Sequence, residues 1–200
     1  MNRFNREDFL RAFQEEWLAQ VHLAPEVLTS PEYPALGDWT RFVLGPGGLL
    51  EGVMLRLQRV VPNLSYIQGR YTVDCSYVGG KELFGSGMHY PSQIHCLIEH
   101  EHGNKVEEEM WKLIHWRAPL KVLIFYDWNQ WEKTSESRRE WLSMKLAKLW
   151  SMVRDVDAHF PENCTTEYLL LVGNRQQSNQ PPIWSFSVSE TTGTQPFIQP

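Results

Sequence analysis

The sequence predicts an α/β fold in which a mixed central sheet is flanked by helices, and three observations support this. Segments with apolar residues at helical spacing alternate with short apolar segments typical of strands. Two strand–helix–strand units, at residues 93–126 and 121–172, imply at least one parallel pairing with a right-handed crossover. The composition, with 42% hydrophobic and 22% charged residues, is that of an ordinary globular chain. Helices packed on a sheet satisfy all three observations.

Two helices are expected before the first strand. Residues 6–21 carry large apolar side chains at helical spacing, which predicts an amphipathic helix. Residues 25–37 contain three prolines and are predicted to be a loop. Residues 49–61 follow a glycine-rich turn and are predicted to be the second helix, which Pro62 ends.

The central part of the chain is predicted to contain most of the sheet. Residues 65–78 are rich in Tyr, Val, Ile and Thr, which favours a strand or a pair of strands. A strong strand is predicted at residues 93–101 and a helix at residues 104–116, with Asn104 as its N-cap. The continuous apolar run at residues 121–126 is typical of a strand buried on both faces.

The remaining residues are predicted to add one long helix and two strands. The helix spans residues 135–159, and Ser137 with Glu140 has the spacing of a capping box for a second start inside it. An apolar strand is expected at residues 168–172, and the alternating pattern of residues 183–188 indicates an edge strand.

The whole chain, residues 1–200, is interpreted as one domain. Its core is expected at residues 49–126, with a helical extension at residues 1–48 and a helix with strands at residues 127–200. The apolar runs are too short to span a bilayer, and the N-terminal segment lacks the apolar core of a signal peptide. We therefore expect a cytoplasmic protein without a membrane partner.

Charge, cysteine content and missing motifs exclude several classes. The net charge of -5 disfavours a generic nucleic-acid coat but allows an enzyme with a local basic face. The three cysteines, Cys75, Cys96 and Cys164, are widely spaced and form no C-x-x-C pair, which argues against disulfides and structural zinc. The sequence contains no phosphate-loop, dinucleotide-binding or nucleophile-elbow motif.

Two glutamates share one face of the strand predicted at residues 93–101. Because alternate residues of a strand face the same way, Glu99 and Glu101 lie opposite to the apolar Cys96 and Ile98. Their separation along the strand is about 7 Å. Burying both carboxylates without a cation is too costly, and Mg²⁺ or Mn²⁺ prefers such oxygen ligands. The Glu-x-Glu element is therefore a candidate metal site.

Two further acids are candidates for the same site. Antiparallel pairing of residues 65–78 with residues 93–101 would bring Asp74 beside Glu99. Glu51, in the second predicted helix, is a candidate outer ligand or partner of a metal-held water. In phosphodiester hydrolysis, a metal ion in such a cluster neutralises charge on the phosphate and lowers the pKa of a water molecule.

The order of elements over residues 49–126, together with these acids, resembles the PD-(D/E)XK nuclease superfamily, which has the restriction-endonuclease-like fold. Asp74 resembles the first acid of that family. Glu99-His100-Glu101 resembles its (D/E)-x-K element, with Glu101 where the family usually has lysine. A minority of restriction enzymes carry glutamate there, and other members place the lysine on the following helix.

Two lysines of the following predicted helix, Lys112 and Lys105, resemble that displaced lysine. The segments Glu107-Glu108-Glu109-Met110-Trp111-Lys112-Leu113 and Arg117-Ala118-Pro119-Leu120-Lys121-Val122-Leu123-Ile124 also look like parts of uncharacterised nuclease-like proteins of the superfamily.

The resemblance implies a metal-dependent nuclease that hydrolyses DNA phosphodiester bonds with Mg²⁺ or Mn²⁺. On this reading Asp74 and Glu99 bind the metal, and Glu101 binds it or acts as the base toward the attacking water. Lys112 stabilises the phosphate or orients the water. Nucleases of this type often act as dimers, so a homodimer is expected together with DNA as partner.

Other functions and roles remain open at this point. A catalytically inactive nuclease-like module for protein interaction or regulation fits the missing lysine and the isoelectric point of about 5.8. A small-molecule hydrolase is a third class. Glu-x-Glu can be a solvated strand edge, Asp74 a turn cap, and Lys112 a surface lysine. Glu107, Glu108 and Glu109 are interpreted as surface charges that favour the start of a helix.

Histidines and basic residues offer two more alternatives. A zinc site could combine Glu99 with His95, His100, His102 or His115, although no zinc-binding helix spacing occurs. Four basic residues of the long predicted helix form either a basic face toward a phosphate backbone or a solvated face. They are Arg138, Arg139, Lys145 and Lys148.

Overall fold

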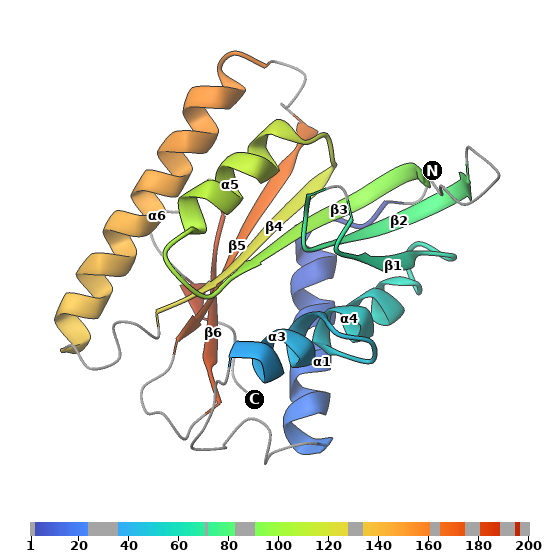
Figure 1. The fold of residues 1–200 in the computed structure, drawn as a ribbon, viewed down its shortest axis with the longest axis horizontal. Coiled ribbons are helices and arrows are strands. Elements are labelled where there is room, and N and C mark those ends of the chain that lie inside the picture. Colours follow the sequence, from blue (N-terminus) through green and yellow to red (C-terminus); the bar gives the residue numbers. More distant parts are fainter. Residues whose placement is uncertain are drawn as a thin grey trace.

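Among the residues described in the computed structural model, seven strands form one sheet in chain order from β1 to β7 (Figure 1). The strands are β1 (Ser65–Gln68), β2 (Cys75–Glu82), β3 (Pro91–Glu101), β4 (Leu120–Tyr126), β5 (Glu167–Asn174), β6 (Ile183–Ser187) and β7 (Gln195–Pro196). The pairs β3–β4 and β4–β5 are parallel and the other pairs are antiparallel. The predicted α/β class with a mixed sheet is therefore confirmed.

The structure describes residues 3–23, 36–70, 72–82, 91–127, 134–160, 165–174, 181–188 and 195–196. The three prolines of the predicted loop and Cys164 lie outside these ranges. Cys75 and Cys96 are buried free thiols. No helix in the described part of the chain has both the length and the apolar character needed to cross a membrane.

Helices cover both faces of the sheet (Figure 1). The first face carries α1 (Arg6–Leu23), α3 (Leu36–Leu44) and α4 (Leu49–Leu57), and the second carries α5 (Val106–His115) and α6 (Ser135–Asp157). Successive residues of β4 alternate between the two layers, because Val122 packs in the first and Leu123 in the second. All seven residues of β4 are buried, which confirms the prediction of a strand covered on both faces.

Helix α3 is the one element of the first layer that the sequence pattern did not predict. It has nine residues, of which Trp39 and Val43 are fully buried against the sheet. The predicted loop was expected to end near Gly37, but the helix already begins at Leu36. Its nine residues make about two and a half turns directly after a proline-rich segment, whose composition favoured a loop.

Three local predictions were wrong. The N-cap of α5 is Lys105 rather than Asn104, and it makes no side-chain cap. Thr134 caps α6 by accepting a hydrogen bond from the Ser137 backbone nitrogen at 3.2 Å, so no second start follows at Ser137 with Glu140. Strand β6 is not an edge strand, since β7 pairs with it.

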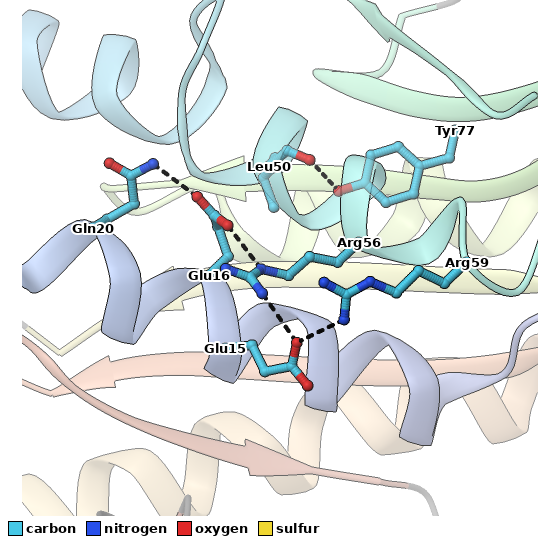
Figure 2. A network of polar contacts seen from close by, with 7 residues as sticks. All are labelled: Glu15, Glu16, Gln20, Leu50, Arg56, Arg59 and Tyr77. Atoms are coloured by element: carbon cyan, nitrogen blue, oxygen red, sulfur yellow. Dashed lines mark hydrogen bonds and ion pairs between the residues drawn. The ribbon is translucent and has the colours of Figure 1, made fainter. Parts of the chain in front are cut away.

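An ion-pair network joins α1 to α4 (Figure 2). Arg56 donates to Glu16 at 2.8 Å and to Glu15 at 3.0 Å, and Gln20 donates to Glu16 at 2.8 Å. The helices come close at Gly52, where a β-carbon would lie 2.4 Å from Cδ of Glu16. The absence of a side chain at this position therefore lets the buried Glu16 reach its partners.

A hydrogen bond ties α4 directly to the sheet. The Tyr77 hydroxyl in β2 donates to the backbone oxygen of Leu50 at 2.6 Å (Figure 2). The helix layer and the strand that follows Asp74 are thus fixed relative to each other.

Lys121 is a buried cation in the middle of the sheet and was not anticipated. Its side chain faces α5 and α6, donating to the Ile114 backbone oxygen at 2.9 Å and to the Tyr168 hydroxyl at 3.1 Å. Tyr168 in turn donates to Asp157 at 3.2 Å. Burial lowers the pKa of Lys121 to about 8, although the charge of Asp157 acts in the opposite direction. The lysine therefore connects the ends of two helices at a cost in desolvation.

We expect Lys121→Met to raise the free energy of unfolding at pH 7 by about 1 kcal/mol or more, because it removes a buried charge. The folded-state pKa is lowered from 10.5 to about 8. Stability is therefore lost as pH falls from about 10.5 to about 8, and the advantage of methionine should grow over that range. Urea denaturation at several pH values measures it, with the exposed Lys105→Met as control. A variant less stable than the parent at every pH would contradict this account.

Candidate active site

Two acidic residues meet across the antiparallel pair β2–β3. Cys75 lies opposite Ile98, so Asp74, immediately before β2, faces Glu99. The Asp74 backbone nitrogen donates to Oε2 of Glu99 at 3.2 Å. The backbone nitrogen of His100 donates to Oδ2 of Asp74 at 2.8 Å. The predicted juxtaposition of Asp74 and Glu99 is confirmed.

Glu99 lies on the face of the sheet that α5 and α6 cover. Its neighbour two residues back, Leu97, packs in the same layer, and the Glu99 side chain is completely buried. His100 lies on the opposite face, as the alternation of a strand predicts. A buried carboxylate in this position needs a compensating charge.

Lys112 of α5 supplies that charge. Its Nζ lies 3.0 Å from Oε1 of Glu99, contacts the carboxylate of Glu109, and donates to the Thr72 backbone oxygen at 3.2 Å. Oε1 of Glu99 is buried and accepts no hydrogen bond of good geometry from the described residues. The contact with Lys112 is therefore an ion pair, and this oxygen keeps lone-pair capacity for a ligand.

The electrostatics of the site favour a cation. Burial and, next, the charge of Asp74 raise the pKa of Glu99, Lys112 opposes them, and the net result is a pKa of about 8. Burial lowers the pKa of Lys112, but its contacts with Glu109 and Glu99 raise it more, so the net shift is upward. Negative charge thus exceeds what one lysine offsets.

Glu109 is the site residue that sequence reasoning missed. It was interpreted as a surface charge at the start of a helix, but its side chain is only 13% exposed and contacts Lys112 one turn later. The three-residue spacing of Glu109 and Lys112 was the available signal. Glu107 is also engaged, because it binds Lys145 at 2.7 Å and Lys148 at 3.1 Å.

The structure does not bring Glu101 or Glu51 to this cluster. Glu101 shares the face of Glu99, but its carboxylate accepts a hydrogen bond from the Gly103 backbone nitrogen in the following turn. Oε2 of Glu51 accepts from the Gly47 backbone nitrogen at 2.6 Å, and its helix α4 covers the other face of the sheet. The predicted role of Glu51 as an outer ligand has no support in this geometry.

The acids that meet here fit a metal ion only when other ligands complete its shell. Within the described ranges, no three His, Cys, Asp or Glu side chains are grouped to hold a metal. Magnesium, however, is commonly held by one or two carboxylates together with substrate phosphates and waters. Asp74 and Oε1 of Glu99, whose contact among the described residues is the ion pair with Lys112, match that pattern.

The histidines do not form the alternative zinc site with Glu99. His100 and His102 lie against Tyr126 on the opposite face, His95 stacks on Phe4, and His115 contacts Trp111 on α5. Burial lowers the pKa of His102 to about 4 and that of His100 well below its ordinary value. Both imidazoles are therefore neutral near pH 7.

A buried series of hydrogen bonds on the opposite face of the sheet holds His100, the residue that contacts Asp74. Trp39 Nε1 donates to the Tyr126 hydroxyl at 2.8 Å, and that hydroxyl lies 2.7 Å from Nε2 of His100. This series of hydrogen bonds fixes His100, whose backbone nitrogen donates to Asp74. Sequence reasoning missed it, since it depends on the unpredicted α3.

Comparisons with known proteins give no relative: no family model matches the chain, and neither the curated proteins nor the solved structures contain a match.

Proposed function

We propose that this protein is a metal-dependent nuclease that hydrolyses phosphodiester bonds of DNA. The observation that carries the proposal is the meeting of Asp74 and Glu99 at one end of the β2–β3 pair, with Lys112 at 3.0 Å from Glu99. The elements follow one another in the order α4, β1, β2, β3, α5, β4. This order supports a restriction-endonuclease-like core, because the resemblance to the superfamily places its metal-binding acids at Asp74 and Glu99.

Each residue of the site has a distinct role in this proposal. A bound Mg²⁺ or Mn²⁺ would supply Lewis acidity toward the scissile phosphate and a nearby water. Asp74 and Glu99 hold that ion, and the backbone nitrogens of His100 and Asp74 orient their carboxylates. The ammonium group of Lys112 would donate a hydrogen bond to an oxygen of the phosphate. Glu101, whose carboxylate accepts from the Gly103 backbone nitrogen, has no role in this proposal.

The second candidate is a nuclease-like module without catalysis, for protein interaction or regulation. One observation favours it: Lys112 already contacts both Glu99 and Glu109, and Glu101 is turned toward Gly103. In that case Lys112 is a permanent counter-ion and the acids bind no metal.

Thermal melts with and without Mg²⁺ or Mn²⁺ separate the two candidates. At a hundredfold excess over Kd, we expect about 2.7 kcal/mol of stabilisation, or roughly 5–10 °C in Tm. Glu99→Gln should abolish this shift and the nicking of supercoiled plasmid DNA. Because burial raises the pKa of Glu99 to about 8, the ion displaces a proton, so the shift should grow as pH rises through that value.

The control is Glu108→Gln, which removes an exposed glutamate of the same helix. It should keep both the metal shift and the nicking. The second candidate is established if neither ion changes the Tm of the parent protein and the DNA stays intact. Nicking that persists in Glu99→Gln would overturn the assignment of the site.

A further inference from the structure

A cleft opens where β4 and β5 end and α6 begins. Its volume is about 310 Å³. Six residues line it: Asp127, Ser135, Arg138, Arg139, Leu142 and Asn174. The carboxyl ends of parallel strands are the usual place for ligands in open α/β sheets.

The cleft shares its face and its edge of the sheet with Glu99. Glu101 pairs with Phe125, and Phe125 pairs with Val172, so the carboxyl ends of β3, β4 and β5 are in register. Phe125 and Val172 pack in the layer of α5 and α6. Asp127 and Asn174 follow two residues later, on the same face. Glu99 pairs with Leu123, and Asp127 and Asn174 lie four residues beyond that level, so a rise of about 3.3 Å per residue and strands about 4.8 Å apart place the cleft roughly 15 Å from Glu99.

Arginine gives this cleft its charge. Lys145 and Lys148, further along α6, form ion pairs with Glu107. The four basic residues considered from the sequence therefore do not act as one basic face, and Arg138 and Arg139 line the cleft. Arg139 is exposed and forms no ion pair or hydrogen bond with another described residue. Arg138, half-buried, stands beside it in the wall. The lining residues include two arginines and one carboxylate, that of Asp127, so their formal charge is positive.

The helix end itself contributes little to this charge. The Ser137 backbone nitrogen already donates to Oγ1 of Thr134, so one of the amides at the start of α6 is satisfied within the chain. The exposed guanidinium group of Arg139 is the charged group that a ligand contacts first. Arginine binds phosphate oxygens through two parallel N–H groups, whereas its hold on other anions is less specific.

We propose that this cleft binds a phosphate group of the nucleic-acid strand whose scissile bond lies at Asp74 and Glu99. This inference rests on the proposed function and adds a binding site for the nucleic-acid strand to the proposed catalytic site. Arg139 provides the main contact, Arg138 supports it, and Leu142 offers an apolar surface to the adjacent sugar or base. Ser135 and Asn174 supply neutral hydrogen-bonding groups.

The experiment measures binding of a short fluorescent DNA strand by anisotropy, with EDTA present so that no hydrolysis occurs. Arg139→Gln should weaken binding about tenfold, and the slope of log K against log salt should decrease by about 1. The matched control is Arg154→Gln, which removes an exposed arginine at the other end of α6. It should bind like the parent protein, and circular dichroism should show that both variants are folded.

The outcomes separate this inference from the proposed function. Phosphate binding in the cleft would be refuted if Arg139→Gln bound the strand as tightly as the parent, or if Arg154→Gln lost as much affinity. Metal-dependent nicking would then be judged separately. A tenfold loss in Arg139→Gln without any metal shift in the parent would support the cleft and refute the nuclease. Competition by inorganic phosphate as effective as competition by unlabelled strand would show a free phosphate site, contrary to the inference.

Discussion

Replacing Lys112 with methionine is expected to reduce metal-dependent DNA nicking by about a hundredfold or more, which is the usual loss when one group that stabilises developing charge is removed. Lys112 is the only lysine among the described residues that contacts Glu99, and its pKa is shifted upward by its contacts with Glu109 and Glu99. Its positive charge is therefore present at neutral pH. Single-turnover nicking of plasmid DNA at saturating Mg²⁺ measures the loss.

The same variant should also change stability in a way that depends on pH. Without Lys112, the buried Glu99 carboxylate faces Asp74 and Glu109 uncompensated, so the metal-free protein should lose about 2 kcal/mol at pH 9. This is less than for a fully buried pair, because the Lys112 side chain is 27% exposed. At pH 6 the loss should be smaller, since a carboxyl with a raised pKa is then protonated.

Divalent ions should restore the stability that Lys112→Met loses, giving this variant a larger Tm shift than the parent. Lys105→Met, on an exposed lysine next to the same helix, is the control and should leave nicking and stability unchanged. If Lys112→Met nicks DNA at the parental rate, Lys112 is a structural counter-ion. If it melts like the parent at pH 9, the ion pair contributes no stability.

Gly173→Val is expected to destabilise the sheet strongly, costing about 3 kcal/mol. A β-carbon at this position would lie 2.5 Å from Cδ1 of the Tyr126 ring on the neighbouring strand. The ring cannot move aside freely, because its hydroxyl is bound to Trp39 and to His100. Urea denaturation monitored by tryptophan fluorescence measures the cost.

A double-mutant cycle tests the cause of that loss. Tyr126→Leu removes the ring and should cost about 3 kcal/mol by itself. If the clash with the ring is the reason, the double variant should lose clearly less than the sum of the two single losses. Additive losses would show that Gly173 is needed for another reason, such as strand conformation.

The elements with a clear period were predictable from the sequence. The helix pattern of residues 6–21 became α1, and the apolar runs became β4 and β5, because burial of a periodic face decides local structure. The acid pair was also within reach, since strand alternation and antiparallel pairing place Asp74 beside Glu99. Short or irregular segments such as α3 carried too little signal.

The mixed α/β class, at least one parallel pairing and the meeting of Asp74 with Glu99 were predicted from the residues alone, because they follow from periods and pairing along neighbouring segments. The structure was needed to show that Glu109 joins Lys112 in the site and that Glu51 and Glu101 do not. The physical reason is that these outcomes depend on how α5 and α4 pack on the sheet and on which oxygen each hydrogen-bond donor reaches. No residue spacing encodes those distances.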